Sequence, residues 1–111
     1  MSKYTVHITK AAERDVANAS NYIDLVLKNP TATDALLDEF EAQVMSLESM
    51  PERNSLARDE ILASWKIRYL LIKNYMAFYI IDEPSKTVHI IRFLYGKSNW
   101  MATLKGVFSI D

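Results

Sequence analysis

The stretch from Trp65 to Trp100 constrains the fold of this chain more than any other part of the sequence. It contains three runs of β-branched, aromatic and aliphatic residues, which are Ile67–Ile72, Tyr75–Ile81 and Thr87–Tyr95. Lys73-Asn74 separates the first two runs, and the polar segment Asp82–Lys86 separates the second two. Short apolar runs between polar turn residues are typical of neighbouring antiparallel strands. The stretch therefore predicts a meander of three strands.

The first part of the chain predicts one strand followed by two helices. Lys3–Ile8 alternates polar and apolar residues, which indicates a strand that buries Tyr4, Val6 and Ile8. Thr9 is the expected N-cap of a helix that runs to about Lys28, and Asn29-Pro30 ends it. A second helix, with Thr31 or Thr33 as its N-cap, is expected to stop at Met50-Pro51. Two helices joined by so short a turn form an antiparallel hairpin.

The order β-α-α-β-β-β predicts a single α+β domain over residues 1–111, with the helical hairpin packed on one face of an antiparallel sheet. Short helical turns are expected near Ala57–Leu62 and Met101–Leu104, the second ended by Gly106. The chain has no cysteine, which excludes disulfides and thiolate chemistry. No apolar run approaches the ~20 residues of a membrane span, and Met1–Lys10 does not resemble a signal peptide, so a cytoplasmic protein without a membrane partner is expected.

A two-residue turn at Lys73-Asn74 places Arg68 opposite Tyr79. One face of the meander then carries Arg68, Leu70, Tyr75, Ala77 and Tyr79, and the other carries Ile67, Tyr69, Leu71, Met76, Phe78 and Ile80. The second face is the more apolar, so we expect it to meet the helices and the first to stay open. We also expect Arg92 on the open face beside Arg68 and Tyr79, because an unpaired arginine under helices is costly.

Few residues suggest chemistry. His7 and His89 are the only histidines, and they fall on separate strands without the spacing of metal ligands, so no metal site is expected. With only two glycines the chain has no phosphate-binding loop, no serine has the context of a nucleophile, and no cofactor is expected. The remaining candidates are cationic and aromatic: Lys66, Arg68, Tyr79, Arg92, Tyr95 and Lys97. Alternatively, Arg68 and Arg92 pair with acidic groups of this chain or of a partner.

Charge is distributed unevenly along the chain. Residues 1–50 carry four basic and eight acidic residues, whereas residues 64–105 carry seven basic and two acidic ones. A basic sheet beside acidic helices suits an anionic partner, although solvated charge without a role explains the same pattern. The pI near 6.1 argues against a dedicated nucleic-acid binder.

Several segments resemble the RelE/ParE superfamily of type II toxin–antitoxin toxins. They are the opening Tyr4–Thr9 with Ala12 and Asp15, Leu47–Pro51 with Arg53, Ile67-Arg68 followed by Asn74-Tyr75 and Phe78-Tyr79, and Val88-x-Ile90 with Arg92–Lys97 and Asn99-Trp100. Together they cover nearly the whole chain in the family's order. The resemblance implies a toxin that a cognate antitoxin neutralises. The toxin is expected to form a homodimer or a heterotetramer with that antitoxin.

The superfamily has two functional branches. RelE-like toxins are mRNA interferases that act on mRNA at the ribosome, and they commonly carry an arginine at the position of Met76 and in some cases a histidine at that of Tyr95. The corresponding nuclease set here would be Lys66, Arg68, Arg92 and Tyr95. ParE-like toxins poison DNA gyrase, and the ending Arg92–Lys97 resembles that branch more closely.

The resemblance therefore favours a ParE-like toxin of a plasmid-stabilisation module, which causes growth arrest by inhibiting DNA gyrase and has no catalytic residues. Contacts with target or antitoxin are expected from Arg68, Tyr79, Arg92, Tyr95, Lys97 and Trp100. Two alternatives stay open at this point. One is the mRNA interferase, an endoribonuclease, and the other is an inactive relative that only binds its antitoxin.

Overall fold

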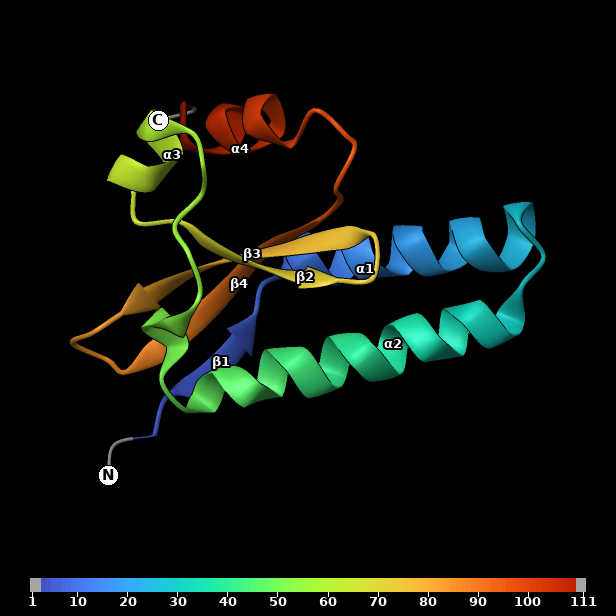
Figure 1. The fold of residues 1–111 in the computed structure, drawn as a ribbon, viewed down its shortest axis with the longest axis horizontal. Helices are drawn as coiled ribbons and strands as arrows, with labels where there is room; N and C mark the ends of the chain where they lie inside the picture. The colour runs from blue at the N-terminus through green and yellow to red at the C-terminus, as the bar shows by residue number, and fades with distance from the viewer. Residues whose placement is uncertain (1–2, 110–111) are drawn as a thin grey trace.

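The computed structural model describes residues 3–109, and its elements follow the predicted order with additional short helices (Figure 1). The strands are β1 (Thr5–Ile8), β2 (Arg68–Ile72), β3 (Tyr75–Asp82) and β4 (Thr87–Tyr95). The helices are α1 (Lys10–Asn21), α2 (Pro30–Met45), α3 (Glu60–Ser64) and α4 (Trp100–Ser109). The single helical turns are η1 (Tyr22–Val26), η2 (Ser46–Glu48) and η3 (Pro51–Arg53).

The four strands form one sheet in the order β1-β4-β3-β2. The meander is confirmed: β2 pairs with β3 and β3 with β4 in antiparallel fashion, and Arg68 lies opposite Tyr79. The α+β fold class is also confirmed, but β1 runs parallel to β4, so the sheet is mixed rather than purely antiparallel. The pairing of β1 is a long-range contact across the helical hairpin, which no local pattern specifies.

The two faces of the sheet are covered by different helices, and our assignment of these faces is wrong. α1 and α2 pack on the face that carries Leu70, Ala77 and Tyr79, which we expected to be open. The opposite face carries Ile67, Met76 and Phe78, and it forms a second cluster with Leu62 of α3 and Leu104 of α4. Figure 1 shows the sheet between these two layers. Because the chain buries both faces, the more apolar one need not be the face under the hairpin.

The helix ends are set by short polar side chains. Thr9 caps α1 as predicted, with its Oγ1 accepting from the Ala12 amide at 3.2 Å. For α2 our prediction of Thr31 or Thr33 is wrong: Asn29 Oδ1 accepts from the Ala32 amide at 3.1 Å and Pro30 occupies the first turn. Proline suits that position because its missing N–H would have no helical partner there. α4 continues through Gly106 to Ser109, so the expected stop at Gly106 is also wrong.

Tyr79 and Arg68 attach the segment after α2 to the sheet. The Tyr79 side chain is fully buried, and its hydroxyl donates to the Pro51 carbonyl at 2.6 Å. This burial raises the pKa of Tyr79 above its usual value. Arg68 Nη1 donates to the carbonyls of Glu52 at 3.1 Å and Asn54 at 2.6 Å. The expected open-face position of Tyr79 is therefore wrong, because its ring belongs to the core under the hairpin.

We predict that Tyr79→Phe lowers the free energy of unfolding by about 1–2 kcal/mol, because the Pro51 carbonyl loses its hydrogen bond inside the core. Urea denaturation measures this difference. Tyr95→Phe is the matched control, because that ring is 43 % exposed, and we expect it to change the free energy of unfolding by less than about 0.5 kcal/mol. Equal losses in the two variants would contradict the role assigned to the Tyr79 hydroxyl.

Candidate functional site

A β-bulge in β4 decides where Arg92 lies. Tyr79 is opposite Ile90 and Phe78 is opposite Arg92, which leaves Ile91 as an additional residue on β4. A bulge of this kind bends the strand and changes the direction of the side chains after it. The predicted alignment of Arg92 with Tyr79 is therefore wrong.

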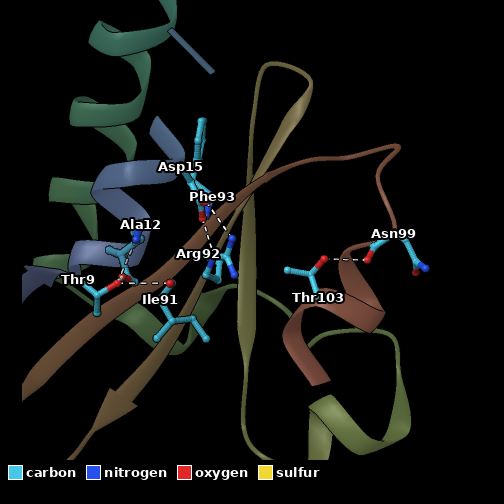
Figure 2. A network of polar contacts seen from close by, with 9 residues as sticks. Thr9, Ala12, Asp15, Ile91, Arg92, Phe93, Asn99 and Thr103 are labelled. Atoms are coloured by element: carbon cyan, nitrogen blue, oxygen red, sulfur yellow. Dashed lines mark hydrogen bonds and ion pairs between the residues drawn. The ribbon is translucent and has the colours of Figure 1, made fainter. Parts of the chain in front are cut away.

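Arg92 is bound to Asp15 of α1 (Figure 2). Its Nε and Nη2 atoms donate to the two carboxylate oxygens at 2.6 and 2.9 Å. The side chains are 21 % and 10 % exposed, respectively. The hydrogen bond to Asp15 raises the pKa of Arg92 above its usual value. This two-point geometry is the strong form of an arginine–carboxylate contact, so Arg92 is committed to this chain's own acid.

The same carboxylate also satisfies the backbone of β4. Asp15 Oδ2 accepts from the Phe93 amide at 3.0 Å. The last pair between β1 and β4 is Ile8 with Ile90, so Phe93 lies beyond the end of β1. An amide at such a strand end needs another acceptor, and α1 supplies it. We did not predict this contact of Asp15 from the sequence, and a carboxylate on the inner side of a helix was the available signal.

The cationic and aromatic residues that we predicted to act together do not form one cluster. Arg68 lies opposite Tyr79, whereas Tyr95 lies opposite Tyr75 at the other end of β3. Four residues along a strand correspond to about 13 Å. Lys66 lies two residues before β2, and its side chain is exposed. Its backbone is in the left-handed region, with φ 63°. No single scissile phosphate would contact all of these groups.

Three of the predicted contact residues lie together in Tyr95–Trp100, which we call the exit segment. Its shape is held by the Gly96 amide, which donates to the Asn74 carbonyl at 2.8 Å, and by the Ser98 amide, which donates to the Tyr95 carbonyl at 2.9 Å. Lys97 is exposed and Tyr95 is 43 % exposed. Trp100 is half-buried, with its ring centroid 5.2 Å from that of Phe78. The exit segment thus presents an aromatic and a cationic side chain to solvent.

A large groove lies between the helical hairpin and the C-terminal end of β4. Its volume is about 930 Å³, and Asp15, Arg92 and Tyr95 line it together with residues of the hairpin. Its apolar lining includes Tyr22, Ile23 and Leu27. We did not predict this groove from the sequence. The available signal was the run Leu25-Val26-Leu27, because three consecutive apolar residues on one helical turn cannot all face the core.

The hairpin end beside this groove has an unusual backbone and an apolar surface. η1 is a π-helical turn. This form is rare in proteins as a whole, but where it occurs it is often at a functional site. Tyr22, Leu25, Val26 and Leu27 are 52 %, 69 %, 61 % and 56 % exposed. An apolar patch of this kind on a small protein usually marks a site of interaction.

Among residues 3–109, no group of three or more histidine, cysteine or acidic side chains could hold a metal ion, and no helix is long and apolar enough to cross a membrane. His7 and His89 nevertheless meet, because β1 and β4 are neighbours in the sheet. The two residues are 82 positions apart in the chain, so no local pattern predicts this contact.

The match of a family model over most of the chain identifies this protein as a toxin of a type II toxin–antitoxin system, and its α+β fold, a helical hairpin on a four-stranded sheet, is shared with solved toxin–antitoxin structures. The chain belongs to the family described as the ParE toxin of the type II toxin–antitoxin system parDE, whose family model matches residues 6–100.

The solved structures that are similar to this chain include two toxin–antitoxin systems. One is the toxin–antitoxin complex RelBE2 from Mycobacterium tuberculosis, with a TM-score of 0.59 and 27 % identity, covering 86 % of this chain and 93 % of that one. The other is the chromosomal ParDE system from P. aeruginosa, with a TM-score of 0.66 and 16 % identity, covering 86 % and 98 %. No curated protein sequence matches the chain.

We predict that Asp15→Asn lowers the free energy of unfolding by about 1–3 kcal/mol, because it leaves the half-buried Arg92 without its counter-charge. Urea denaturation followed by circular dichroism measures the loss. Asp24→Asn is the matched control, since Asp24 is an exposed acid on η1, and a change below about 0.5 kcal/mol is expected there. If Asp15→Asn were as stable as the wild-type protein, the contact would not hold α1 to β4.

Proposed function

We propose that this protein is a ParE-like toxin that arrests growth by inhibiting DNA gyrase, and that it acts by binding rather than by cleaving RNA. The observation that carries the proposal is the engagement of Arg68 and Arg92 within the chain itself. Arg68 binds two backbone carbonyls, and Arg92 binds the Asp15 carboxylate. Half of the alternative nuclease set therefore has a structural role.

Cleavage of RNA through the 2′-hydroxyl requires a base, an acid and cations arranged around one phosphate. Lys66 and Tyr95, the remaining members of the nuclease set, lie near opposite ends of the meander. Met76, at the position where RelE-like toxins commonly carry an arginine, is only 8 % exposed. These positions support inhibition by recognition, with Tyr95, Lys97 and Trp100 of the exit segment as the contacts with gyrase.

The groove supports a second partner, the cognate antitoxin. Its lining combines apolar side chains of the hairpin with the cation Lys73, whereas Asp15 already balances the charge of Arg92. An amphipathic segment with an apolar stripe and acidic residues would complement this lining. A disordered segment that folds on binding can cover a surface of this size. The similar solved structures are themselves described as toxin–antitoxin systems.

The proposal predicts that the purified protein abolishes supercoiling of relaxed plasmid by gyrase while leaving mRNA on translating ribosomes intact. Gel electrophoresis of the plasmid and primer extension on the mRNA measure the two activities. Lys97→Ala should raise the concentration needed for half-inhibition about three- to fivefold, the size of effect that one exposed charge has. Lys10→Ala is the control, since Lys10 is an exposed lysine on α1, and its half-inhibition should equal that of the wild type.

The outcomes separate the three functional classes. Cleaved mRNA with normal gyrase activity would overturn the proposal in favour of an mRNA interferase. Normal activity in both assays, without growth arrest on expression, would identify an inactive relative that only binds antitoxin.

We also predict that Leu27→Asp weakens binding of the cognate antitoxin at least tenfold, because it places a carboxylate in the apolar part of the groove. Leu71→Asp is the matched control: Leu71 is 66 % exposed and lies on β2, away from the groove. Isothermal titration calorimetry with the cognate antitoxin measures both affinities. Equal weakening by the two variants would show that the antitoxin does not occupy the groove.

A further inference from the structure

The two histidines of the chain lie side by side on one face of the sheet. His7 of β1 and His89 of β4 are register partners in the parallel pair. Their Nδ1 atoms are 3.0 Å apart, and their rings meet edge-on, with centroids 5.2 Å apart and an angle of 89° between the planes. Neither residue takes part in the groove or in the exit segment.

The contact between two ring nitrogens has a specific chemical meaning. A neutral imidazole carries its proton on one nitrogen and a lone pair on the other. As a hydrogen bond, the contact needs one Nδ1 to donate and the other to accept. When both rings carry their proton on Nε2, the two Nδ1 atoms have no proton between them, and a cation bound by both would satisfy their lone pairs.

The distance between these nitrogens fits a metal ion. Two nitrogens at about 2.1 Å from one divalent cation lie about 3.0 Å apart at an angle of 90°, and about 3.4 Å apart at the tetrahedral angle. The 3.0 Å between the His7 and His89 nitrogens equals the first value. Two ligands at 90° to each other occupy adjacent positions in square-planar and octahedral coordination. Imidazole is a preferred ligand of nickel, copper and zinc.

Solvent reaches this part of the sheet. Val6 and Ile8 of β1, together with Val88 and Ile90 of β4, turn toward the core under α1 and α2, so the histidines between them face the other way. On that other face, α3 and α4 contribute Leu62 and Leu104 to the cluster over Ile67, Met76 and Phe78. His7 is exposed and His89 is half-buried. Water can therefore occupy the remaining coordination positions of a bound cation.

We propose that His7 and His89 form a two-histidine chelate for a divalent first-row transition metal ion. Among the described residues no third histidine, cysteine or acidic side chain completes a group with them, so water supplies the remaining ligands. The bound cation joins β1, a four-residue strand at the sheet edge, to the central strand β4. This site is independent of the function proposed above, because it lies on neither of the two surfaces assigned to gyrase and antitoxin.

The test is a titration of the tag-free full chain with Ni²⁺ at mildly alkaline pH, followed by calorimetry and by thermal unfolding. We expect one ion per chain and a rise in the unfolding temperature, because the ion binds the folded protein and not the separated strands. His7→Ala and His89→Ala should each weaken binding at least tenfold, because the chelate is lost. Thr5 lies two residues before His7 on the same face of β1. Thr5→Ala keeps both histidines and should bind as the wild type does.

A second measurement does not depend on a variant that folds. In the wild-type protein, substoichiometric Cu²⁺ should broaden the amide NMR signals around residues 5–9 and 87–91 before any others. The proposal is overturned if the wild type neither binds Ni²⁺ nor gains thermal stability. It is equally overturned if the histidine variants bind as tightly as the wild type, or if Cu²⁺ broadens a different part of the chain first.

Discussion

The carboxylate of Asp15 is the contact on which the arrangement of helices and sheet depends. It binds the Arg92 guanidinium at two points and accepts from the Phe93 amide, so one side chain of α1 satisfies both the bulged part of β4 and the backbone beyond the end of β1. Without it, a half-buried cation and a strand amide would both lack a partner inside the protein, and each such loss is costly. The contact also lies in the wall of the groove, so the framework and the binding surface share it.

This use of cations limits what the toxin can do chemically. Arginine forms bidentate contacts well, whether its partner is a phosphate or the protein's own carboxylate. In this chain Arg92 binds the Asp15 carboxylate and Arg68 binds two backbone carbonyls, whereas Lys66 and Lys97 are exposed. Isolated lysines contribute to recognition and to association rates more than to stabilisation of a transition state. A toxin that works by occupying its target is consistent with that distribution.

The parts of the fold that sequence patterns predicted are those set by local chemistry. The three strands of the meander, the turn at Lys73-Asn74 and the cap at Thr9 each depend on residues a few positions apart. The faces of the sheet were predicted wrongly because both are apolar, and the bulge after Ile90 was missed because one additional residue leaves no pattern. The parallel pairing of β1, and with it the contact of His7 with His89, depends on a crossover of about 80 residues. The groove was not predicted either, because the residues of α1, α2 and β4 that line it are far apart in the sequence.

The exposed hairpin end links stability to the presence of a partner. Leu25 and Val26 of the π-helical turn, and Leu27 directly after it, are all more than half exposed. Burial of such side chains would contribute roughly 1.5–3 kcal/mol each. The core gains nothing from these residues while the protein is alone, so their apolar character is explained by a complex that covers them. Because the groove beside them contains Asp15 and Arg92, a partner seated there excludes water from that ion pair. The attraction within the covered pair then strengthens, but desolvation of the two charges offsets that gain. Neutralisation of the toxin would stabilise its fold because the partner binds the folded chain and not the unfolded one.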